Sequence, residues 1–235
     1  KGKLSKVSIK SYLEGFRAMF AQYLKFEYEK LGYRIDPIKI PPFDGSANRY
    51  IRPSDELLQK VKEWYIKLRT DDIEKWMFVT WMLCFAMRTG DVQRLKWSNI
   101  IKKNGTDMLF YMPHKTQHSS KRTVSWPITN DIMEGIKDYR QWLVKNKSKL
   151  KKYNPENVWV GKATDIQSAI NKDMRALGFT GTKACYELRK ICIDHVYEKF
   201  GSEMASSISG DNIDTILHYY ADPGALNKVI NVSTL

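Results

Sequence analysis

The longest apolar stretch of the chain occupies residues 76–87 (WMFVTWMLCFAM), with Lys75 and Arg88 at its two ends. These twelve residues are too few to cross a bilayer, because a transmembrane helix needs about 20. A helix that is apolar on every side is stable only where protein covers its whole surface. We therefore predict a buried helix here.

The composition predicts a folded core and a polyanionic partner. Hydrophobic residues make up 43% of the 235 residues, which excludes wholesale disorder. This length accommodates one large domain, or one domain with a smaller appendage. Lysine and arginine outnumber the acids by 39 to 26, for a formal net charge of +13. That excess favours nucleic acid as the partner, and a solvated basic surface is the alternative.

The three cysteines, Cys84, Cys185 and Cys192, form no CxxC pair. An odd number without that spacing argues against a disulfide framework or a structural zinc site and favours a reducing compartment. The chain opens on Lys1 without an apolar leader, so we expect no signal peptide and a trimmed fragment of a longer chain.

Residues 30–48 contain three of the eight prolines and two glycines, which is typical of a linker. Apolar residues recur at mostly helical intervals before it, over residues 8–31. We therefore expect a partial helical segment at residues 1–32, a linker at 33–50, the main domain at 51–223 and a C-terminal tail at 224–235.

The pattern after the linker predicts a mainly α fold with a small antiparallel β-sheet (α+β). Ser54 is placed to cap a helix that continues to Leu68, and residues 70–72 cap the buried helix, which we expect to reach Met87. Short strands are expected at 107–112 and 122–126, on either side of a basic turn, and a strand fragment at 157–160. Further helices are expected at 132–143, 164–177, 183–200 and 213–220.

Two cations stand at positions that suit phosphate chemistry. Arg88 follows the apolar helix beside Gly90, so the core can hold it while it faces outward; near a helix end it also complements the helix dipole. Lys115 lies on the turn of the expected hairpin, where it can deliver a proton or contact a phosphate. Taken alone, the phosphate contact is favoured.

A third cation, Arg189, is expected near the N-terminus of its helix, where a phosphate could bind. We expect Arg189 to fall off the apolar stripe of that helix, whose members are Cys185, Leu188, Cys192, His195 and Val196. That helical spacing makes the cysteines and His195 core residues rather than metal ligands. His114 and His118 are four apart but lie in a turn, so we interpret them as solvated or DNA-facing.

In chain order these elements resemble the tyrosine recombinase (phage integrase) family. Residues 87–100 (MRTGDVQRLKWSNI) resemble its first arginine box, and residues 112–128 resemble its lysine-bearing hairpin. Residues 186–190 resemble the His-x-Leu-Arg box, and residues 210–223 the closing box that carries the tyrosine. The resemblance covers residues 51–223, and residues 8–28 resemble part of the family's core-binding domain.

The resemblance implies the tyrosine recombinase catalytic-domain fold and an enzyme that cleaves and rejoins DNA strands through a covalent 3′-phosphotyrosine. Arg88 and Arg189 would hold the phosphate, Lys115 would be the general acid and Asp91 would support Arg88. Further DNA contacts are expected from hairpin and loop cations, namely Lys121, Arg122, Lys149 and Lys151.

The same resemblance implies double-stranded DNA as the partner, a tetramer on DNA and a monomer when free. It implies no membrane, no cofactor and no metal. A mobile-element integrase of this kind is expected in the cytoplasm, with the nucleoid of a prokaryote or its phage.

Two positions depart from the family pattern. Tyr186 stands where the box has histidine, and the later histidine or tryptophan falls at Gly210 or Asp211. These departures keep open a catalytically impaired DNA-binding protein on the same fold, and a type IB topoisomerase is a further alternative. The nucleophile is expected at Tyr220, with Tyr219 as the alternative.

Overall fold

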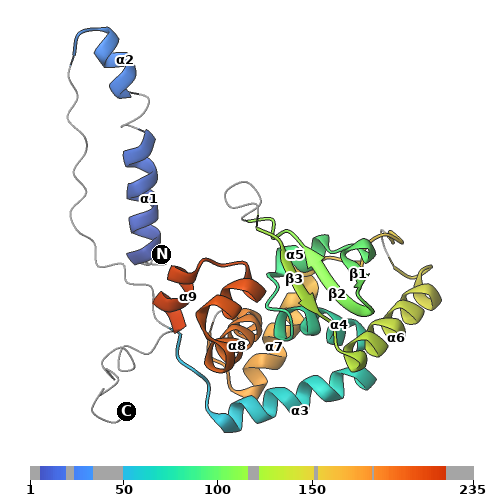
Figure 1. Ribbon diagram of the computed structural model, residues 1–235. Helices are drawn as coiled ribbons and strands as arrows, with labels where there is room; N and C mark the ends of the chain where they lie inside the picture. The colour runs from blue at the N-terminus through green and yellow to red at the C-terminus, as the bar shows by residue number, and fades with distance from the viewer. Residues whose placement is uncertain are drawn as a thin grey trace. The chain divides into compact units, whose positions relative to one another are not determined.

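The computed structural model describes residues 6–19, 24–33, 50–115, 122–150, 153–181 and 183–220. The chain divides into two compact units, Lys1–Arg49 and Tyr50–Leu235. The first unit contains helices α1 (Lys6–Met19) and α2 (Lys25–Lys30), and the second contains every other element (Figure 1). Most of the linker expected at 33–50 lies outside the described residues, so the domain limits remain a prediction.

Side-chain caps start the first two helices of the second unit. Helix α3 (Asp55–Asp71) begins after Ser54, whose Oγ accepts a hydrogen bond from the backbone nitrogen of Leu57 at 3.3 Å. Helix α4 (Ile73–Leu83) begins after Asp72, whose Oδ1 accepts from the backbone nitrogen of Lys75 at 2.9 Å. Each cap satisfies a backbone donor that the first helical turn leaves free. Both caps were expected from the sequence, and both are confirmed.

The apolar stretch lies at the centre of the core. Residues 76–82 are all buried, and α4 packs against α3, α6, α7 and α8. The expected continuation of this helix to Met87 is wrong, because α4 ends at Leu83. Ala86 takes the left-handed conformation (φ 50°), which a helix cannot continue through. Arg88 therefore lies at the N-terminus of the short helix α5 (Thr89–Arg94) rather than at the end of α4.

A three-stranded antiparallel sheet (Figure 1) has the order β1 (Ile100–Lys103), β2 (Thr106–Tyr111) and β3 (Val124–Pro127), and β3 packs against helix α8. β2 and β3 are the strands expected from the sequence, paired with Leu109 opposite Trp126. β1 was not expected, because its four residues (IIKK) are mostly exposed and do not alternate. In place of the strand fragment expected at 157–160, a single bridge joins Lys96 to Asn157.

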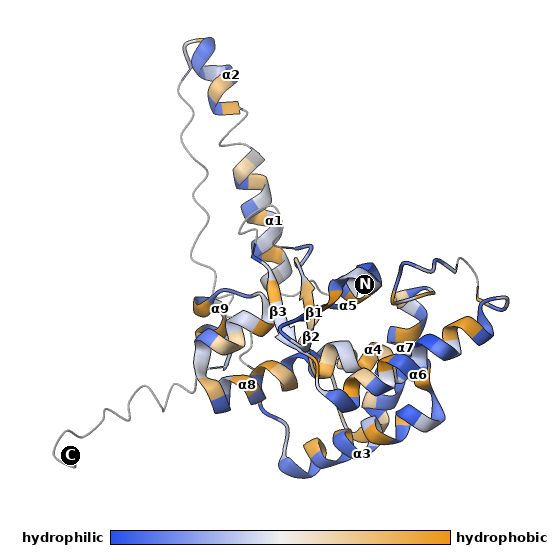
Figure 2. Cartoon of the chain, turned by 45° about the vertical axis from the view of Figure 1, so that its right-hand side comes forward, coloured by the Kyte–Doolittle hydropathy of each residue, from blue (hydrophilic) through white to orange (hydrophobic). Residues whose placement is uncertain are grey.

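The remaining elements are the 3-10 turn η2 (Trp97–Asn99) and helices α6 (Asn130–Asn146), α7 (Ala163–Leu177), α8 (Ala184–Ser209) and α9 (Ile213–Tyr220). Most of them show an apolar and a polar side in Figure 2. Helix α8 has a break at Gly201 (φ 81°) and continues beyond the expected end at Phe200. The mainly α fold with a small antiparallel sheet is confirmed.

Gly210 ends α8 and touches the strand end of the hairpin. Its backbone is left-handed (φ 67°), and a Cβ at this position would lie 2.9 Å from Cγ of Pro113. Both the conformation and the close contact require glycine here. The residue after it, Asp211, is thereby placed beside the end of β2.

Candidate active site

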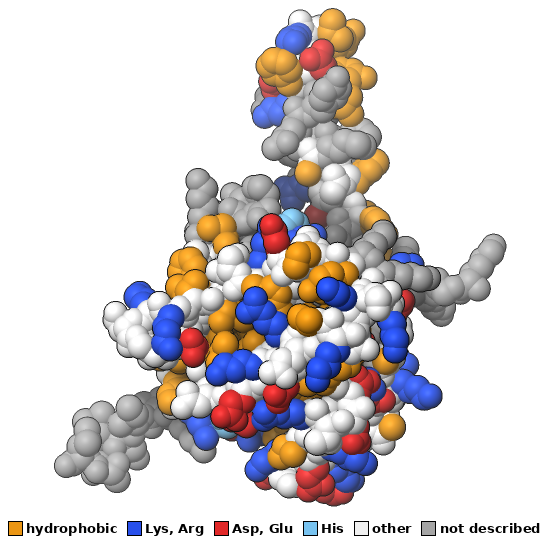
Figure 3. Space-filling model, turned by 90° about the vertical axis from the view of Figure 1, so that its right-hand side faces the viewer, with side chains coloured by type: hydrophobic (Ala, Val, Ile, Leu, Met, Phe, Trp, Pro, Cys, Tyr) orange, Lys and Arg blue, Asp and Glu red, His pale blue; other side chains and the backbone are white. Residues whose placement is uncertain are grey.

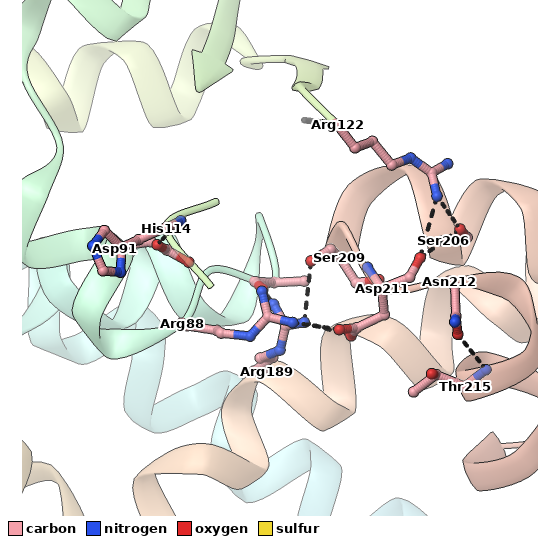
Figure 4. A network of polar contacts seen from close by, with 11 residues as sticks. Arg88, Asp91, His114, Arg122, Arg189, Ser206, Ser209, Asp211, Asn212 and Thr215 are labelled. Carbon is pink, nitrogen blue, oxygen red and sulfur yellow. Dashed lines mark hydrogen bonds and ion pairs between the residues drawn. The ribbon is translucent and has the colours of Figure 1, made fainter. Parts of the chain in front are cut away.

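Arg189 is buried inside the second unit. Its side chain is 1% exposed, and its guanidinium donates hydrogen bonds to the carbonyl oxygen of Ala86, to that of Ser209 at 3.1 Å, and to Oδ2 of Asp211 at 2.6 Å (Figure 4). The left-handed turn at Ala86 supplies the first of these carbonyls. Burial is the largest single influence and lowers the pKa of Arg189, but the Asp211 carboxylate together with Tyr186, Tyr111 and Tyr220 outweighs it, so the pKa is raised. Arg189 was expected to fall off the apolar stripe of its helix, and the structure nevertheless buries it.

Arg88 approaches the same carboxylate from the other side. It lies just before α5, its side chain is 16% exposed, and its Nη2 donates to Oδ1 of Asp211. Its Nη1 is buried and has no hydrogen-bond partner among the described residues. One edge of the guanidinium is therefore available to a further acceptor.

Asp211 thus bridges the two arginines, with one carboxylate oxygen on each (Figure 4). Its backbone is fixed independently: its nitrogen donates to Oγ of Ser209 at 3.1 Å, and its carbonyl oxygen accepts from Oγ of Ser206 at 2.7 Å and from Nη1 of Arg122 at 3.2 Å. Two guanidinium groups converging on one oxyanion are the arrangement that binds phosphate or carboxylate strongly. In the sequence, Asp211 stood out only as one of two positions, with Gly210, where the histidine or tryptophan of the family is missing. The sequence pattern that could have indicated its role is an acidic residue within the box at 210–223, which is expected to lie beside Arg88 and Arg189.

The two adjacent tyrosines of α9 make different contacts. Tyr220 packs on the small apolar cluster formed by Ala86 and residues of α8 and α9, and its ring lies 5.2 Å from that of Tyr50. Burial raises the pKa of the Tyr220 hydroxyl, and Arg189 is near enough to oppose that shift. The Tyr219 ring instead contacts His218 at 5.1 Å.

A cavity of about 430 Å³ lies beside Arg88. It is lined from several elements by Arg88, Thr89, Gly90, Asp91, Arg94, His114, Lys115, Gln167, Asn171, Lys183, Cys185 and Tyr186. Lys115, the expected general acid, and Tyr186, from the His-x-Leu-Arg box, therefore line the same cavity as Arg88. Arg189, Tyr219 and Tyr220 do not line it.

Asp91 is buried but supports a different partner from the one expected. Its Oδ1 accepts a hydrogen bond from the backbone nitrogen of His114 at 2.9 Å, whereas the ion pair of Arg88 is with Asp211. Its Oδ2 is buried without a hydrogen-bond partner in the described part of the chain. Asp91 therefore holds the turn that carries Lys115 against α5.

The expected DNA-contacting cations fall into three groups. Lys121 and Lys151 lie outside the described residues, and Lys149 is exposed after α6. Arg122 donates to Oγ of Ser206 at 2.7 Å as well as to the Asp211 carbonyl, so it ties the hairpin to the end of α8.

The residues weighed as metal ligands take other roles. Cys185 and Cys192 are buried as expected, and burial raises the pKa of each thiol to about 12. His195 is exposed, so the expectation that it belongs to the core is wrong. The described residues contain no group of three His, Cys, Asp or Glu side chains that could hold a metal ion.

In the same part of the chain, no helix has the length and apolar character needed to cross a membrane.

No family model and no curated protein matches the chain, but solved structures do. XerH site-specific recombinase bound to palindromic difH has a TM-score of 0.74 at 15% identity, covering 100% of this chain and 67% of that one. The Tn1549 transposon integrase with circular intermediate DNA has a TM-score of 0.65 at 12% identity, covering 93% and 76%. A lambda integrase tetramer bound to a Holliday junction has a TM-score of 0.57 at 12% identity, covering 89% and 65%.

These similarities confirm the fold expected from the four sequence boxes. The chain has the tyrosine recombinase fold.

Proposed function

We propose that the protein is a site-specific DNA recombinase of the integrase type. The observation that carries this proposal is the convergence of Arg88 and Arg189 on a single oxyanion within a tyrosine recombinase fold. Paired arginines can each donate two hydrogen bonds to a phosphate in a planar, two-pronged geometry that lysine does not have. Tyr220 lies close enough to Arg189 to be influenced by its charge.

In the proposed reaction, Oη of Tyr220 attacks the scissile phosphorus and passes its proton to solvent water. The P–O bond to the 5′ oxygen breaks, and Lys115 protonates that leaving oxygen. Arg88 and Arg189 neutralise the non-bridging oxygens as charge develops on them. The 3′-phosphotyrosine conserves the bond energy, so a 5′ hydroxyl can reverse the step without ATP or a metal ion.

Duplex DNA is the proposed partner. The net charge of +13 favours a polyanion, and exposed lysines and arginines are spread over the face shown in Figure 3. The XerH and Tn1549 structures contain DNA, and the lambda integrase structure is a tetramer on a junction. We extend this to a tetramer on DNA and a monomer when free. Residues 1–32 are proposed as part of the DNA clamp, and the protein is proposed to act on nucleoid DNA in the cytoplasm.

A DNA-binding protein of the same fold with impaired catalysis is the second candidate. Two observations favour it: a carboxylate lies between the two arginines, and Tyr186 cannot supply the cation that histidine supplies at its position.

A suicide substrate distinguishes these candidates. The full-length protein is incubated with a nicked duplex that carries its own attachment site, and the covalent adduct is resolved on a denaturing gel. The proposal requires an adduct that forms in the presence of a chelator and is lost in Tyr220→Phe. Binding without an adduct supports the second candidate. Relaxation of supercoiled plasmids that lack the site would indicate a type IB topoisomerase instead.

A further inference from the structure

Two positive charges and one negative charge meet at the centre of the candidate site. The Asp211 carboxylate gives one oxygen to Arg88 and the other to Arg189, and its side chain is 19% exposed. A carboxylate that bridges two guanidinium groups has the same pattern of acceptors as the two non-bridging oxygens of a phosphodiester. The site already contains, as part of the chain, an anion of the kind it would bind.

We infer that Asp211 is an internal ligand of the arginine pair, which a substrate phosphate must displace before it can bind. The identity of that phosphate as a DNA phosphodiester rests on the proposed function. Asp211 then competes with the substrate for the two arginines. A positioning residue would instead hold the arginines in place for the substrate.

The hydrogen bonds of Asp211 allow this exchange. Its backbone nitrogen and carbonyl oxygen are bound by Ser209, Ser206 and Arg122, and none of these bonds involves the carboxylate. The side chain can therefore rotate away from the arginines while the backbone after Gly210 stays in place.

The burial of Arg189 requires an anion beside its guanidinium in both the free and the phosphate-bound protein. At 1% exposure its guanidinium is removed from water, and a buried cation without a counter-charge is strongly unfavourable. Asp211 supplies the counter-charge in the free protein, and the phosphate takes over that role when it binds. In the inferred exchange the phosphate takes the Nη2 donors of Arg88 and Arg189 that Asp211 now occupies, so the two anions exclude each other there.

The test compares Asp211→Asn with the parent, using inorganic phosphate as the probe. Phosphate is titrated at constant ionic strength, set with chloride, and affinity is obtained from the rise in melting temperature. Asp214→Asn is the matched control, because this exposed acid of α9 lies three residues away and its loss changes the net charge equally. We expect phosphate to bind Asp211→Asn about tenfold more tightly than the parent, and the control to equal the parent.

The same titration also gives a result if an Asp211 variant is unfolded in chloride alone. If the carboxylate is an internal ligand, added phosphate replaces it and restores the cooperative melting of Asp211→Asn and of Asp211→Ala. Failure of phosphate to restore either variant would overturn the inference. Unchanged or weaker phosphate binding in a folded Asp211→Asn would also overturn it, since a positioning residue gives that result. An equal gain in phosphate affinity in Asp214→Asn would show that the effect comes from net charge alone, and it would also overturn the inference.

This outcome is separate from that of the adduct assay. Tighter phosphate binding in Asp211→Asn with no adduct from the parent supports the internal ligand and rejects the recombinase. An adduct from the parent without any gain in phosphate affinity supports the recombinase and rejects the internal ligand.

Discussion

The ring of Tyr50 packs against the ring of Tyr220, with centroids 5.2 Å apart and planes inclined by 49°. The backbone nitrogen of Tyr50 also donates to the carbonyl oxygen of Tyr219 at 3.2 Å. Arg52, two residues on, is paired with Asp194 and Glu198 of α8. The first residues of the second unit therefore fasten the end of α9, which carries the proposed nucleophile, to the helix that carries Arg189.

This contact predicts that Tyr50 positions Tyr220. Tyr50→Ala removes the ring that holds Tyr220, so we expect adduct formation on the suicide substrate to slow about tenfold or more, with DNA affinity unchanged. The Tyr50 hydroxyl is buried without a hydrogen-bond partner among the described residues, so Tyr50→Phe should retain the parent rate. Equal loss in the two variants would show that the hydroxyl, and not the ring, is needed.

The two tyrosines of α9 are expected to differ in function. Tyr220→Phe keeps the packing on the small cluster but removes the attacking oxygen, so it should bind DNA and form no adduct. Tyr219→Phe should still form adduct, because its side chain contacts His218 instead. Peptide mapping of the adduct formed by the parent identifies the residue, and a DNA-linked Tyr219 would reverse the assignment.

Arg189→Lys separates charge from geometry. Lysine keeps the positive charge, but its single nitrogen cannot replace the two guanidinium nitrogens through which Arg189 reaches its acceptors, so we expect adduct formation to fall by roughly two orders of magnitude while DNA binding persists. Leu188→Ala is the structural control: it should lower the free energy of unfolding by about 2–5 kcal/mol, as measured by urea titration. If the Arg189→Lys variant is folded and cleaves like the parent, the assignment of Arg189 to the catalytic site is wrong.

The buried thiols predict a loss of stability in alkali. Burial raises the pKa of Cys185 and of Cys192 to about 12 in the folded chain, whereas an unfolded cysteine titrates near about 8.5. The unfolded state therefore releases these protons first, so their contribution to stability is complete below about pH 8.5 and is lost as the pH rises toward about 12. We expect the free energy of unfolding to fall with pH over this window, under reducing conditions. Cys192→Ala should make that decline shallower, and an unchanged slope would contradict the assignment.

Binding to duplex DNA should weaken steeply with salt, because contacted phosphates release counterions. Lys149 is exposed after α6, and if it contacts a phosphate, Lys149→Gln should lower the slope of log affinity against log salt by about one. The matched control is Lys67→Gln on α3, an exposed lysine paired with Asp71, which should leave the slope unchanged. Affinity that is independent of salt would contradict DNA binding as a whole.

The parts of the fold that depend on neighbouring residues were predictable from the sequence. Ser54 and Asp72 cap their helices through donors three residues ahead, and α9 occupies the range that its spacing indicates. The order of the boxes also indicated the fold. Each cap, each helical spacing and each single box lies within a short window of the chain.

The parts that depend on distant contacts were not predictable in this way. The end of α4 is set by a left-handed Ala86, whose carbonyl oxygen is bound by Arg189, 103 residues later. Arg189 is buried because that carbonyl, the carbonyl of Ser209 and the Asp211 carboxylate surround it, and no helical pattern contains these partners. A charged residue in a helical sequence indicates an exposed face unless its counter-charge is known.

The close contact at Gly210 has a mechanical consequence. The distance of 2.9 Å between a Cβ at this position and Cγ of Pro113 means that the hairpin and the loop after α8 meet across a gap narrower than a methyl group. Pro113 lies two residues before Lys115, and Gly210 directly precedes Asp211. A displacement of the hairpin toward this loop therefore finds no free space, so we expect movement of Lys115, the proposed general acid, to be coupled to movement of the Asp211 carboxylate.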